Sequence, residues 1–374
     1  MLKILHTADL HLGLEFGLLT AEDGRKLSRA RLDVVRTILS VADLHAVDVV
    51  LWAGDVFDTP EPAEDWWRGL AGIFRSQRHW SRPVVLLPGN HDPIKAQSVF
   101  HRDHPFRSLL PEWVHVVESG RFELPVGDDA VILAAPCQTT AGAEDLALSL
   151  PTRAEGDTRI RVGLVHGSTF DIEGHQTNFP IARDAPEQRG LDYLAVGDTH
   201  GHRVIAGPGP APIVYPGAPE QARFGETDTG SVAVVLIPRA GARPTIIPER
   251  VGRWTWRDET VTSLPALRRL ASEDLSTTVL RLRFDMTIPV TDEKEVGELI
   301  RQLRGDLAST GRAGALVVDR SGLRVEVGAL EDVMSGAPET LAIVANTLAA
   351  VSEHDDEARR AAQLLYRMLS EAPA

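Results

Sequence analysis

The chain has 374 residues, 43% of them hydrophobic and 25% charged, a composition typical of a globular protein with more than one domain. Its single cysteine, Cys137, excludes an intramolecular disulfide framework, and no apolar run is long enough to cross a bilayer, so we expect a cytoplasmic protein without membrane association. The net charge of −14 disfavours a tight, self-sufficient nucleic-acid binder, although bound divalent ions would neutralise clustered carboxylates.

Short β-rich runs alternate with helical patterns over the first two-thirds of the chain. Several of these runs are apolar on both faces, which is typical of strands in the middle of a sheet that helices cover. The spacing of apolar residues predicts helices over residues 32–42 and 66–77. We therefore expect an α/β fold, a β-sandwich flanked by helices. The predicted strands cover residues 2–7, 47–53, 84–87, 131–134, 160–165, 191–196, 232–236 and 245–248.

The pattern changes past about residue 255. A strand over 278–284, an amphipathic helix over 293–307 and strands over 315–319 and 323–327 predict a small α+β cap domain. The boundaries expected are 1–255 for the first domain and 256–332 for the cap.

Two further helices are predicted over residues 333–374. The first carries an apolar stripe from Leu341 to Val351, and the second begins at Asp355-Asp356 and contains Met368 and Leu369. These helices are either a docking element for a partner or pack back onto the cap domain, and the sequence leaves both alternatives open.

The first candidate metal ligands follow two of the predicted strands. Asp9 and His11 are separated by one residue, and side chains two apart on an extended strand end point the same way, so both could reach one ion. Asp55 follows another apolar run after Gly54, and its two carboxylate oxygens could bridge two ions. Taken singly, each motif is weak, because Gly-Asp at a strand end is usually a turn.

The segment Gly89-Asn90-His91-Asp92 is more specific. Asn90 can offer a neutral amide oxygen to a metal, while His91 can lie beside the substrate as a proton donor. Asp92 could hold the orientation of the His91 imidazole and raise its basicity. We therefore predict His91 and Asp92 as catalytic residues and Asn90 as a metal ligand.

Three more candidate ligands follow strands in the second half of the first domain. His166 ends an apolar run, and Asp198 and His200 lie two apart after the next. His202 belongs to the same cluster, but its role is left open. Carboxylate, amide and imidazole ligands together suit two closely spaced divalent ions better than one structural zinc, and such a pair clamps both oxygens of a phosphoryl displacement.

Together these motifs resemble the calcineurin-like metallophosphoesterase superfamily. Segments 9–13 (DLHLG) and 54–58 (GDVFD) look closest to the SbcD family of DNA repair nucleases, the bacterial counterpart of the Mre-eleven nuclease. Segment 215–220 (YPGAPE) is similar to a stretch that follows the last ligand motif of that family. The motif resemblance covers about residues 1–225, and the rest matches only in its layout of a cap domain followed by helices.

The resemblance implies a division of labour among these residues. His91 would assist departure of the leaving group while a water attacks the phosphodiester phosphorus in line. The ions would be two divalent metals, typically manganese, with magnesium as the alternative. By resemblance, one ion would be held by Asp9, His11 and His200 and the other by Asn90, His166 and Asp198, with Asp55 as the bridge.

One residue departs from the family pattern. The family usually has Gly-His-x-His where segment 197–200 reads GDTH, so that Asp198 replaces a histidine. An aspartate adds charge and a harder oxygen, which should shift the metal preference toward manganese or magnesium. A similar variant occurs in the smaller YhaO-type members, and the chain resembles that branch more than SbcD proper.

The function expected is manganese-dependent exo- or endonucleolytic hydrolysis of DNA in repair. The resemblance further implies a homodimer and an SbcC-like coiled-coil ATPase as partner. Arg31, in a basic stretch from residue 25 to 31, either lies on a solvated helix face or contacts phosphate. Two alternatives stay open: a small-molecule phosphodiesterase or phosphatase using the same metals, and a non-catalytic scaffold that binds DNA ends or a partner.

Overall fold

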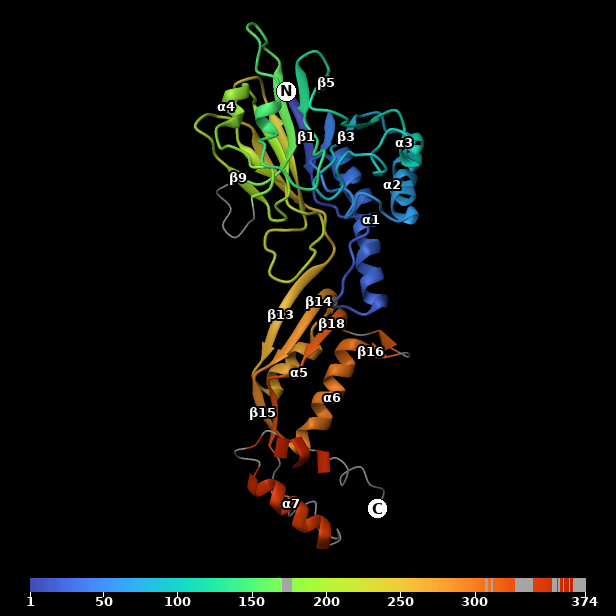
Figure 1. Ribbon diagram of the computed structural model, residues 1–374, viewed down its shortest axis with the longest axis vertical. Helices are drawn as coiled ribbons and strands as arrows, with labels where there is room; N and C mark the ends of the chain where they lie inside the picture. The colour runs from blue at the N-terminus through green and yellow to red at the C-terminus, as the bar shows by residue number, and fades with distance from the viewer. Residues whose placement is uncertain are drawn as a thin grey trace. The chain divides into compact units, whose positions relative to one another are not determined.

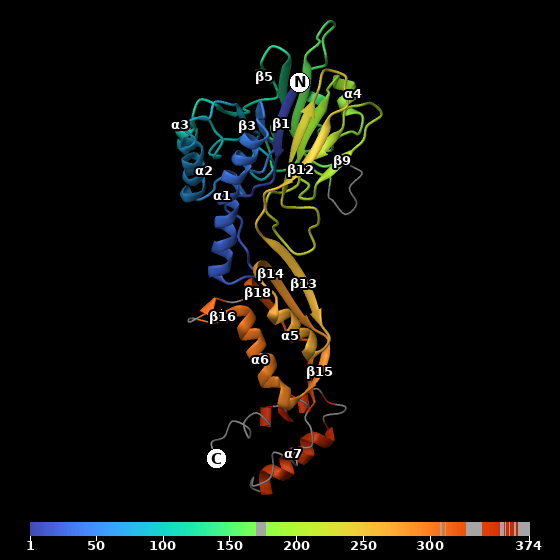
Figure 2. The same ribbon diagram turned by 180° about the vertical axis from the view of Figure 1, so that it is seen from behind.

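The computed structural model describes residues 1–169, 177–306, 309–310, 312–326, 339–351, 355, 357–358, 360–362 and 364–365. The chain divides into two compact units, Met1–Thr255 and Trp256–Ala374, coloured blue to yellow and yellow to red in Figures 1 and 2. Among the described residues, no helix is both long and apolar enough to span a membrane.

The first unit contains two six-stranded sheets, ordered β12-β11-β1-β2-β3-β4 and β5-β6-β7-β8-β10-β9. The central strands β1 to β3 and β6 to β8 pair in parallel, while β11 and β12 join the first sheet antiparallel. All eight predicted strands are present, with ends that differ by up to two residues. The strands are β1 (Leu2–Thr7), β2 (Val49–Trp52), β3 (Val84–Leu86), β4 (Val114–Val116), β5 (Phe122–Val126), β6 (Ala130–Ala134), β7 (Ile160–His166), β8 (Tyr193–Gly197), β9 (Arg203–Ile205), β10 (Ile213–Tyr215), β11 (Ser231–Ile237) and β12 (Thr245–Arg250).

The two sheets pack face to face around an apolar core. On β1, Ile4 belongs to the core between the sheets, while Leu5 belongs to the core beneath the helices on the outer face. Helices α1 (Ala21–Leu44), α2 (Glu64–Ser76) and α3 (Pro105–Leu109) cover the first sheet, and α4 (Ala185–Arg189) and the 3₁₀ helix Ala147–Ser149 cover the second (Figure 1). Because the central strands are buried on both faces, they read as continuous apolar runs. The predicted α/β sandwich is confirmed.

Helix α1 is longer than its apolar stripe suggested. It begins after Thr20, whose hydroxyl accepts a hydrogen bond from the backbone N–H of Asp23 at 3.1 Å, a typical N-cap. Arg31 lies on neither a solvated face nor a phosphate-binding one. Its side chain is buried and donates to the carbonyls of Leu10 (2.8 Å) and Glu220 (3.1 Å). Arg31 therefore ties α1 to the loop after β1.

The second unit is an α+β structure. The sheet β13-β14-β18 packs against α5 and α6 around its own apolar core. Two short strand pairs, β15–β19 and β16–β17, accompany it. The elements are β13 (Thr255–Val261), α5 (Leu264–Ser272), β14 (Leu275–Phe284), β15 (Met286–Pro289), α6 (Val290–Arg304), β16 (Gly305–Asp306), β17 (Ser309–Thr310), β18 (Ala313–Asp319), β19 (Leu323–Glu326) and α7 (Glu339–Val351).

Helix α6 ends at Arg304, earlier than predicted. Gly305 follows with a φ of 78° and begins a strand, so the backbone leaves the helical region there. Leu307 lies outside the described residues. So do Asp356, Met368 and Leu369 of the second C-terminal helix, and the predicted boundary at 332/333. The separation of a cap from a C-terminal docking element stays a prediction.

Candidate metal centre

The seven predicted metal ligands come together at one edge of the sandwich. They follow, or in one case end, the parallel strands β1, β2, β3, β7 and β8. The carboxyl ends of parallel strands meet at one edge of a sheet, and the face-to-face packing brings the edges of both sheets together. Ligands that are up to 191 residues apart in the sequence, from Asp9 to His200, therefore share one site.

The loops after β1 and β2 hold each other in place. The backbone N–H of Asp9 donates to the carbonyl of Gly54 at 3.1 Å, and that of His11 donates to the carbonyl of Asp55 at 2.9 Å. Asp9, His11, Asp55 and Asp198 all have positive φ, at 55°, 45°, 50° and 106°. Such backbone strain clusters at functional sites, where the surrounding structure enforces it.

Asp9 and His11 thus reach the same cluster by another route than predicted. The expectation rested on an extended strand end, in which alternate side chains share a face. The structure instead places both residues in the left-handed region after β1 has ended at Thr7. The separation by one residue was informative, but the physical reason given for it was wrong.

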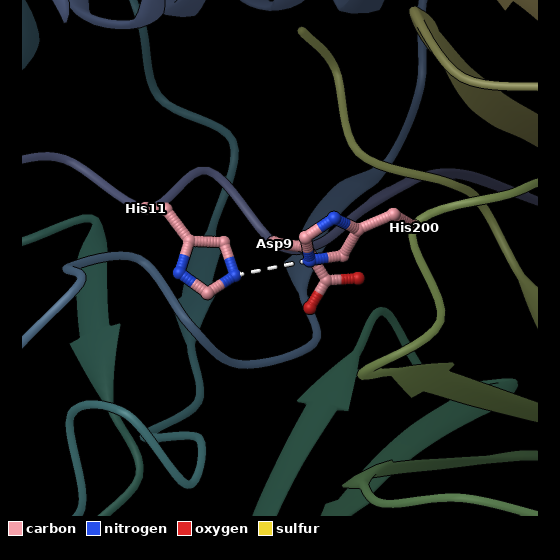
Figure 3. Close-up of side chains that lie close together, drawn as sticks. All are labelled: Asp9, His11 and His200. Carbon is pink, nitrogen blue, oxygen red and sulfur yellow. Dashed lines mark hydrogen bonds between the residues drawn. The ribbon is translucent and has the colours of Figure 1, made fainter. Parts of the chain in front are cut away.

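One half of the site is built around two imidazoles. The Nε2 atoms of His11 and His200 lie 3.2 Å apart, and Figure 3 shows the two rings facing each other with the carboxylate of Asp9 beside them. One ligand atom from each of these three residues lies within 4.8 Å of the others. We call Asp9, His11 and His200 the nitrogen half of the site.

The other half is richer in oxygen. Nε2 of His166 lies 2.7 Å from Oδ1 of Asn90 and 3.9 Å from Oδ1 of Asp198. We call Asn90, His166 and Asp198 the oxygen half. Asp55 stands between the halves, because its Oδ2 atom lies 3.6 Å from Nε2 of His11 and 3.4 Å from Nε2 of His166.

The second nitrogen of each imidazole is already engaged. Nδ1 of His166 donates to the carbonyl of Ala53 at 2.8 Å, while Nδ1 of His11 pairs with Asp58 at 3.0 Å and Nδ1 of His200 with Glu226 at 2.6 Å. This arrangement leaves three Nε2 atoms directed into the site. Metal-binding histidines are held in this way in proteins, so the donors fit a pair of divalent ions.

Burial and the charges of neighbouring groups shift the pKa values of the acids and imidazoles of the site. Burial raises the pKa of Asp9 to about 6 and lowers the pKa of His11 to about 4. For Asp55, burial acts upward, but the imidazoles of His166 and His11 outweigh it and hold the pKa of Asp55 well below its usual range. His11 is therefore neutral at physiological pH, with a lone pair free for a cation.

His91 stands at the open side of the site. Its ring packs edge-on against His11 with centroids 4.7 Å apart, and its Nδ1 lies 3.0 Å from the carbonyl oxygen of Asp58. Its backbone N–H donates to Oδ1 of Asp55 at 2.9 Å. The side chain is exposed, unlike those of Asp9, Asp55 and His166.

Asp92 does not orient His91 as predicted. It is buried, and its carboxylate accepts hydrogen bonds from the backbone N–H groups of Gly89 (2.7 Å) and Phe57 (2.8 Å). Asp92 therefore fastens the loop after β3 to the loop after β2. Burial, followed by the negative charge of Asp55, raises the pKa of Asp92 to about 7. The partner of the His91 ring is Asp58, through its main chain.

Sequence reasoning assigned no role to Asp58 or Glu226. Asp58 belongs to the GDVFD segment, so a signal was available for it. No sequence motif pointed to Glu226, because it lies in a loop 26 residues after His200, the histidine that it contacts. Its Oε2 also accepts from the backbone N–H groups of Ala222 (2.8 Å) and Arg223 (3.3 Å), which fix the carboxylate in the loop.

His202 and His6 take no part in either half. The backbone N–H of His202 donates to the carbonyl of Asp228 at 2.8 Å, and burial lowers the pKa of its ring. His6 is fully buried between the sheets, where Nδ1 lies 2.9 Å from the hydroxyl of Tyr193. The ring of His6 therefore has a structural partner inside the sandwich.

The fold, with its clusters of carboxylates and imidazoles that could hold metal ions, is that of a metal-dependent phosphoesterase. A family model described as calcineurin-like phosphoesterase matches residues 2–202, more than half of the chain. The chain therefore belongs to the calcineurin-like phosphoesterases, and this membership supports a metal-dependent hydrolase.

Three relatives give finer comparisons. The chain is 28% identical to the uncharacterized metallophosphoesterase YhaO of Bacillus subtilis, over 60% of this chain and 55% of that protein. It is 27% identical to the DNA double-strand break repair protein Mre11 of Aeropyrum pernix, over 68% and 62%. It is 35% identical to a subunit of the SbcCD nuclease of Bacillus subtilis, over 24% and 22%. The chain thus spans less than two-thirds of the length of each relative.

Proposed function

We propose that this chain is a divalent-metal-dependent DNA nuclease, with manganese as the preferred ion and magnesium as an alternative. The observation that carries the proposal is the position of Oδ2 of Asp55, within 3.6 Å of one imidazole from each half of the site. A single carboxylate oxygen between two ligand sets suits a bridge between two ions. Similarity to a subunit of a nuclease and to a DNA double-strand break repair protein supports DNA as the substrate.

In this proposal the metal ligands are the seven residues that the sequence analysis predicted. Two divalent ions in such a site supply an activated water and neutralise the charge that develops on the phosphoryl group. Asp55 would bridge the nitrogen half (Asp9, His11 and His200) and the oxygen half (Asn90, His166 and Asp198).

In this proposal His91, which is not a metal ligand, donates a proton to the leaving group. Its Nδ1–H points at the carbonyl of Asp58, which leaves Nε2 for the substrate. As an imidazolium, His91 can give a proton to the leaving oxygen and so help the phosphodiester bond to break. Because the ring is exposed at the open side of the site, a substrate can reach it without any movement of the ligands.

The test measures cleavage and metal content together. Purified chain with Mn²⁺ should degrade linear DNA, and a chelator should stop the reaction. His91→Ala should lower cleavage by about 10²–10⁴-fold while the number of bound ions stays the same. His79→Ala, which removes an exposed histidine from the helix α2–β3 connection, is the control and should be as active as wild type. Failure to cut any DNA with both ions bound would refute the nuclease assignment.

One observation favours a second candidate, hydrolysis of small phosphodiesters or phosphomonoesters. The net charge of −14 gives the chain little general attraction for a DNA backbone. Steady-state rates on cyclic nucleotides and on aryl phosphodiesters, measured with and without competing DNA, separate the two. Fast turnover of a small substrate that excess DNA does not inhibit would favour this second candidate.

The proposal includes a partner, an SbcC-like coiled-coil ATPase, and a homodimer. Helix α7 exposes the apolar side chains of Ile343, Val344 and Val351, which are 60%, 46% and 46% accessible. An apolar helix face of this kind suits docking to another helix. Ile343→Asp should abolish co-purification with such an ATPase and leave metal content unchanged. Retained co-purification would remove α7 as the docking element.

A further inference from the structure

The two halves of the site differ in donor chemistry. The nitrogen half offers two imidazole nitrogens and one carboxylate, from His11, His200 and Asp9. The oxygen half offers an amide oxygen and a carboxylate around one imidazole nitrogen, that of His166. The difference comes from Asp198, which stands where the resemblance predicts a histidine. Imidazole suits borderline ions such as Zn²⁺, whereas carboxylate and amide oxygens suit Mn²⁺ and Mg²⁺.

The groups behind the ligands increase this difference. In the nitrogen half, both imidazoles pair through Nδ1 with carboxylates, Asp58 at 3.0 Å and Glu226 at 2.6 Å. A carboxylate partner raises the basicity of a ligating imidazole. His166 in the oxygen half has a neutral partner at Nδ1, the carbonyl of Ala53. Each imidazole of the nitrogen half thus has a carboxylate at Nδ1, whereas the imidazole of the oxygen half has a backbone carbonyl there.

Asp198 is held in place as a ligand by its own partner. The hydroxyl of Ser168, a fully buried residue, donates to Oδ2 of Asp198. The other oxygen, Oδ1, then faces Nε2 of His166 at 3.9 Å. The backbone N–H of Asp198 donates to both carboxylate oxygens of Asp9, at 2.9 and 3.2 Å, so its main chain is fixed as well.

We propose that the centre is a mixed-metal one. The nitrogen half selects a borderline ion such as Zn²⁺, and the oxygen half selects a hard ion, Mn²⁺ or Mg²⁺. Asp198 determines the choice in the oxygen half, and Ser168 positions it. The inference rests on the two-metal site of the proposed function, keeps manganese or magnesium for the oxygen half and replaces it with a borderline ion in the nitrogen half. It is independent of the substrate.

The metal-free chain, equilibrated with an excess of both Zn²⁺ and Mn²⁺, tests this. After gel filtration, elemental analysis should find one zinc and one manganese per chain, and Mn²⁺ electron paramagnetic resonance should show an isolated ion. In Asp198→His, saturating Zn²⁺ should fill both halves. Excess Mn²⁺ should then no longer displace zinc from the oxygen half, as it should in the wild-type chain. Asp228→His is the control, because Asp228 also has a positive φ (57°) but belongs to neither half, and it should load like wild type.

Two further variants separate positioning from folding. Ser168→Ala should lower Mn²⁺ affinity about 10–100-fold and leave Zn²⁺ affinity unchanged, whereas Glu226→Gln should do the reverse. Glu220→Gln is the control for Glu226, since Glu220 lies in the same loop and accepts from the backbone of Arg253 and Trp254 instead of from a site histidine.

Two outcomes would overturn the proposal. One is wild-type chain in which zinc displaces manganese equally from both halves. The other is an equal loss of both ions in Ser168→Ala and in Glu226→Gln. Neither outcome depends on DNA cleavage, so the nuclease assignment would stand or fall separately.

Discussion

Gly54 is a position at which one added methyl group should disturb both the backbone and a predicted metal ligand. It lies immediately before Asp55 with a φ of +93°, and a Cβ there would lie 2.2 Å from Nδ1 of His166 and 2.6 Å from Cγ of that ring. The imidazole cannot move aside without losing its hydrogen bond to the carbonyl of Ala53. Gly54→Ala should therefore displace a metal ligand as well as strain the backbone.

Three free-energy costs add up to the expected loss of folding stability in Gly54→Ala. The left-handed conformation costs a residue with a Cβ about 1–2 kcal/mol. Forcing an atom into a filled space costs about 1–3 kcal/mol, and loss of the His166 hydrogen bond about 1 kcal/mol more. Gly156→Ala is the matched control, because Gly156 has a φ of +81° and open space where its Cβ would lie. It should show the first cost alone, so the two variants should differ by about 2–4 kcal/mol.

Differential scanning calorimetry of the metal-free variants measures this difference. For a unit of this size, about 2–4 kcal/mol corresponds to a Tm about 5–15 °C lower in Gly54→Ala than in Gly156→Ala. Elemental analysis should also find fewer than two ions bound to Gly54→Ala. If the two variants unfold at the same temperature and bind the same number of ions, the close packing of Gly54 against His166 is not what holds this ligand.

Three further predictions concern buried groups around the site. Asp92→Ala should destabilise the chain by about 2–5 kcal/mol in urea unfolding, because it leaves two buried backbone N–H groups unpaired; Asp92→Asn, which keeps an acceptor, should cost less. Arg31→Met should cost about 2–4 kcal/mol, because two carbonyls lose a buried donor, and a neutral effect would show that these hydrogen bonds are replaceable. Burial lowers the pKa of His6 from 6.5 to about 3, so the unfolded chain takes up a proton below pH 6.5 that the folded chain refuses. Stability should then fall as the pH drops from 6.5 toward 3, by up to about 1.4 kcal/mol per pH unit, and His6→Gln should remove that part of the slope.

Local sequence patterns predicted the positions of most of the proposed ligands. Each ligand motif follows an apolar run, and β1, β2, β3, β7 and β8 lie where those runs predict them. Parallel strands impose this pattern, because their carboxyl ends point to one edge of the sheet and their ligands follow immediately. The same locality explains why the end of α6 was misplaced. Gly305 reads as one more helical residue until its positive φ is known.

Local patterns did not predict the residues that hold the site histidines and loops in place. Glu226 contacts His200 across 26 residues, and Asp58 contacts His11 across 47. Asp92 was assigned to its sequence neighbour His91, but its carboxylate bonds to the backbone of Gly89 and, 35 residues away, of Phe57. Such partners are chosen by how loops pack against one another, which no local pattern records.

The sequence by itself therefore determined the class of chemistry, because ligand type and position after a strand are local properties. It also identified Asp198 as the residue that departs from the family pattern. The division of the ligands into two halves came from the family resemblance. Only the tertiary structure decided which atom of Asp55 lies between the halves and which residue holds each imidazole. These are distances between segments that fold together from opposite ends of the first unit, and the packing of two sheets sets them.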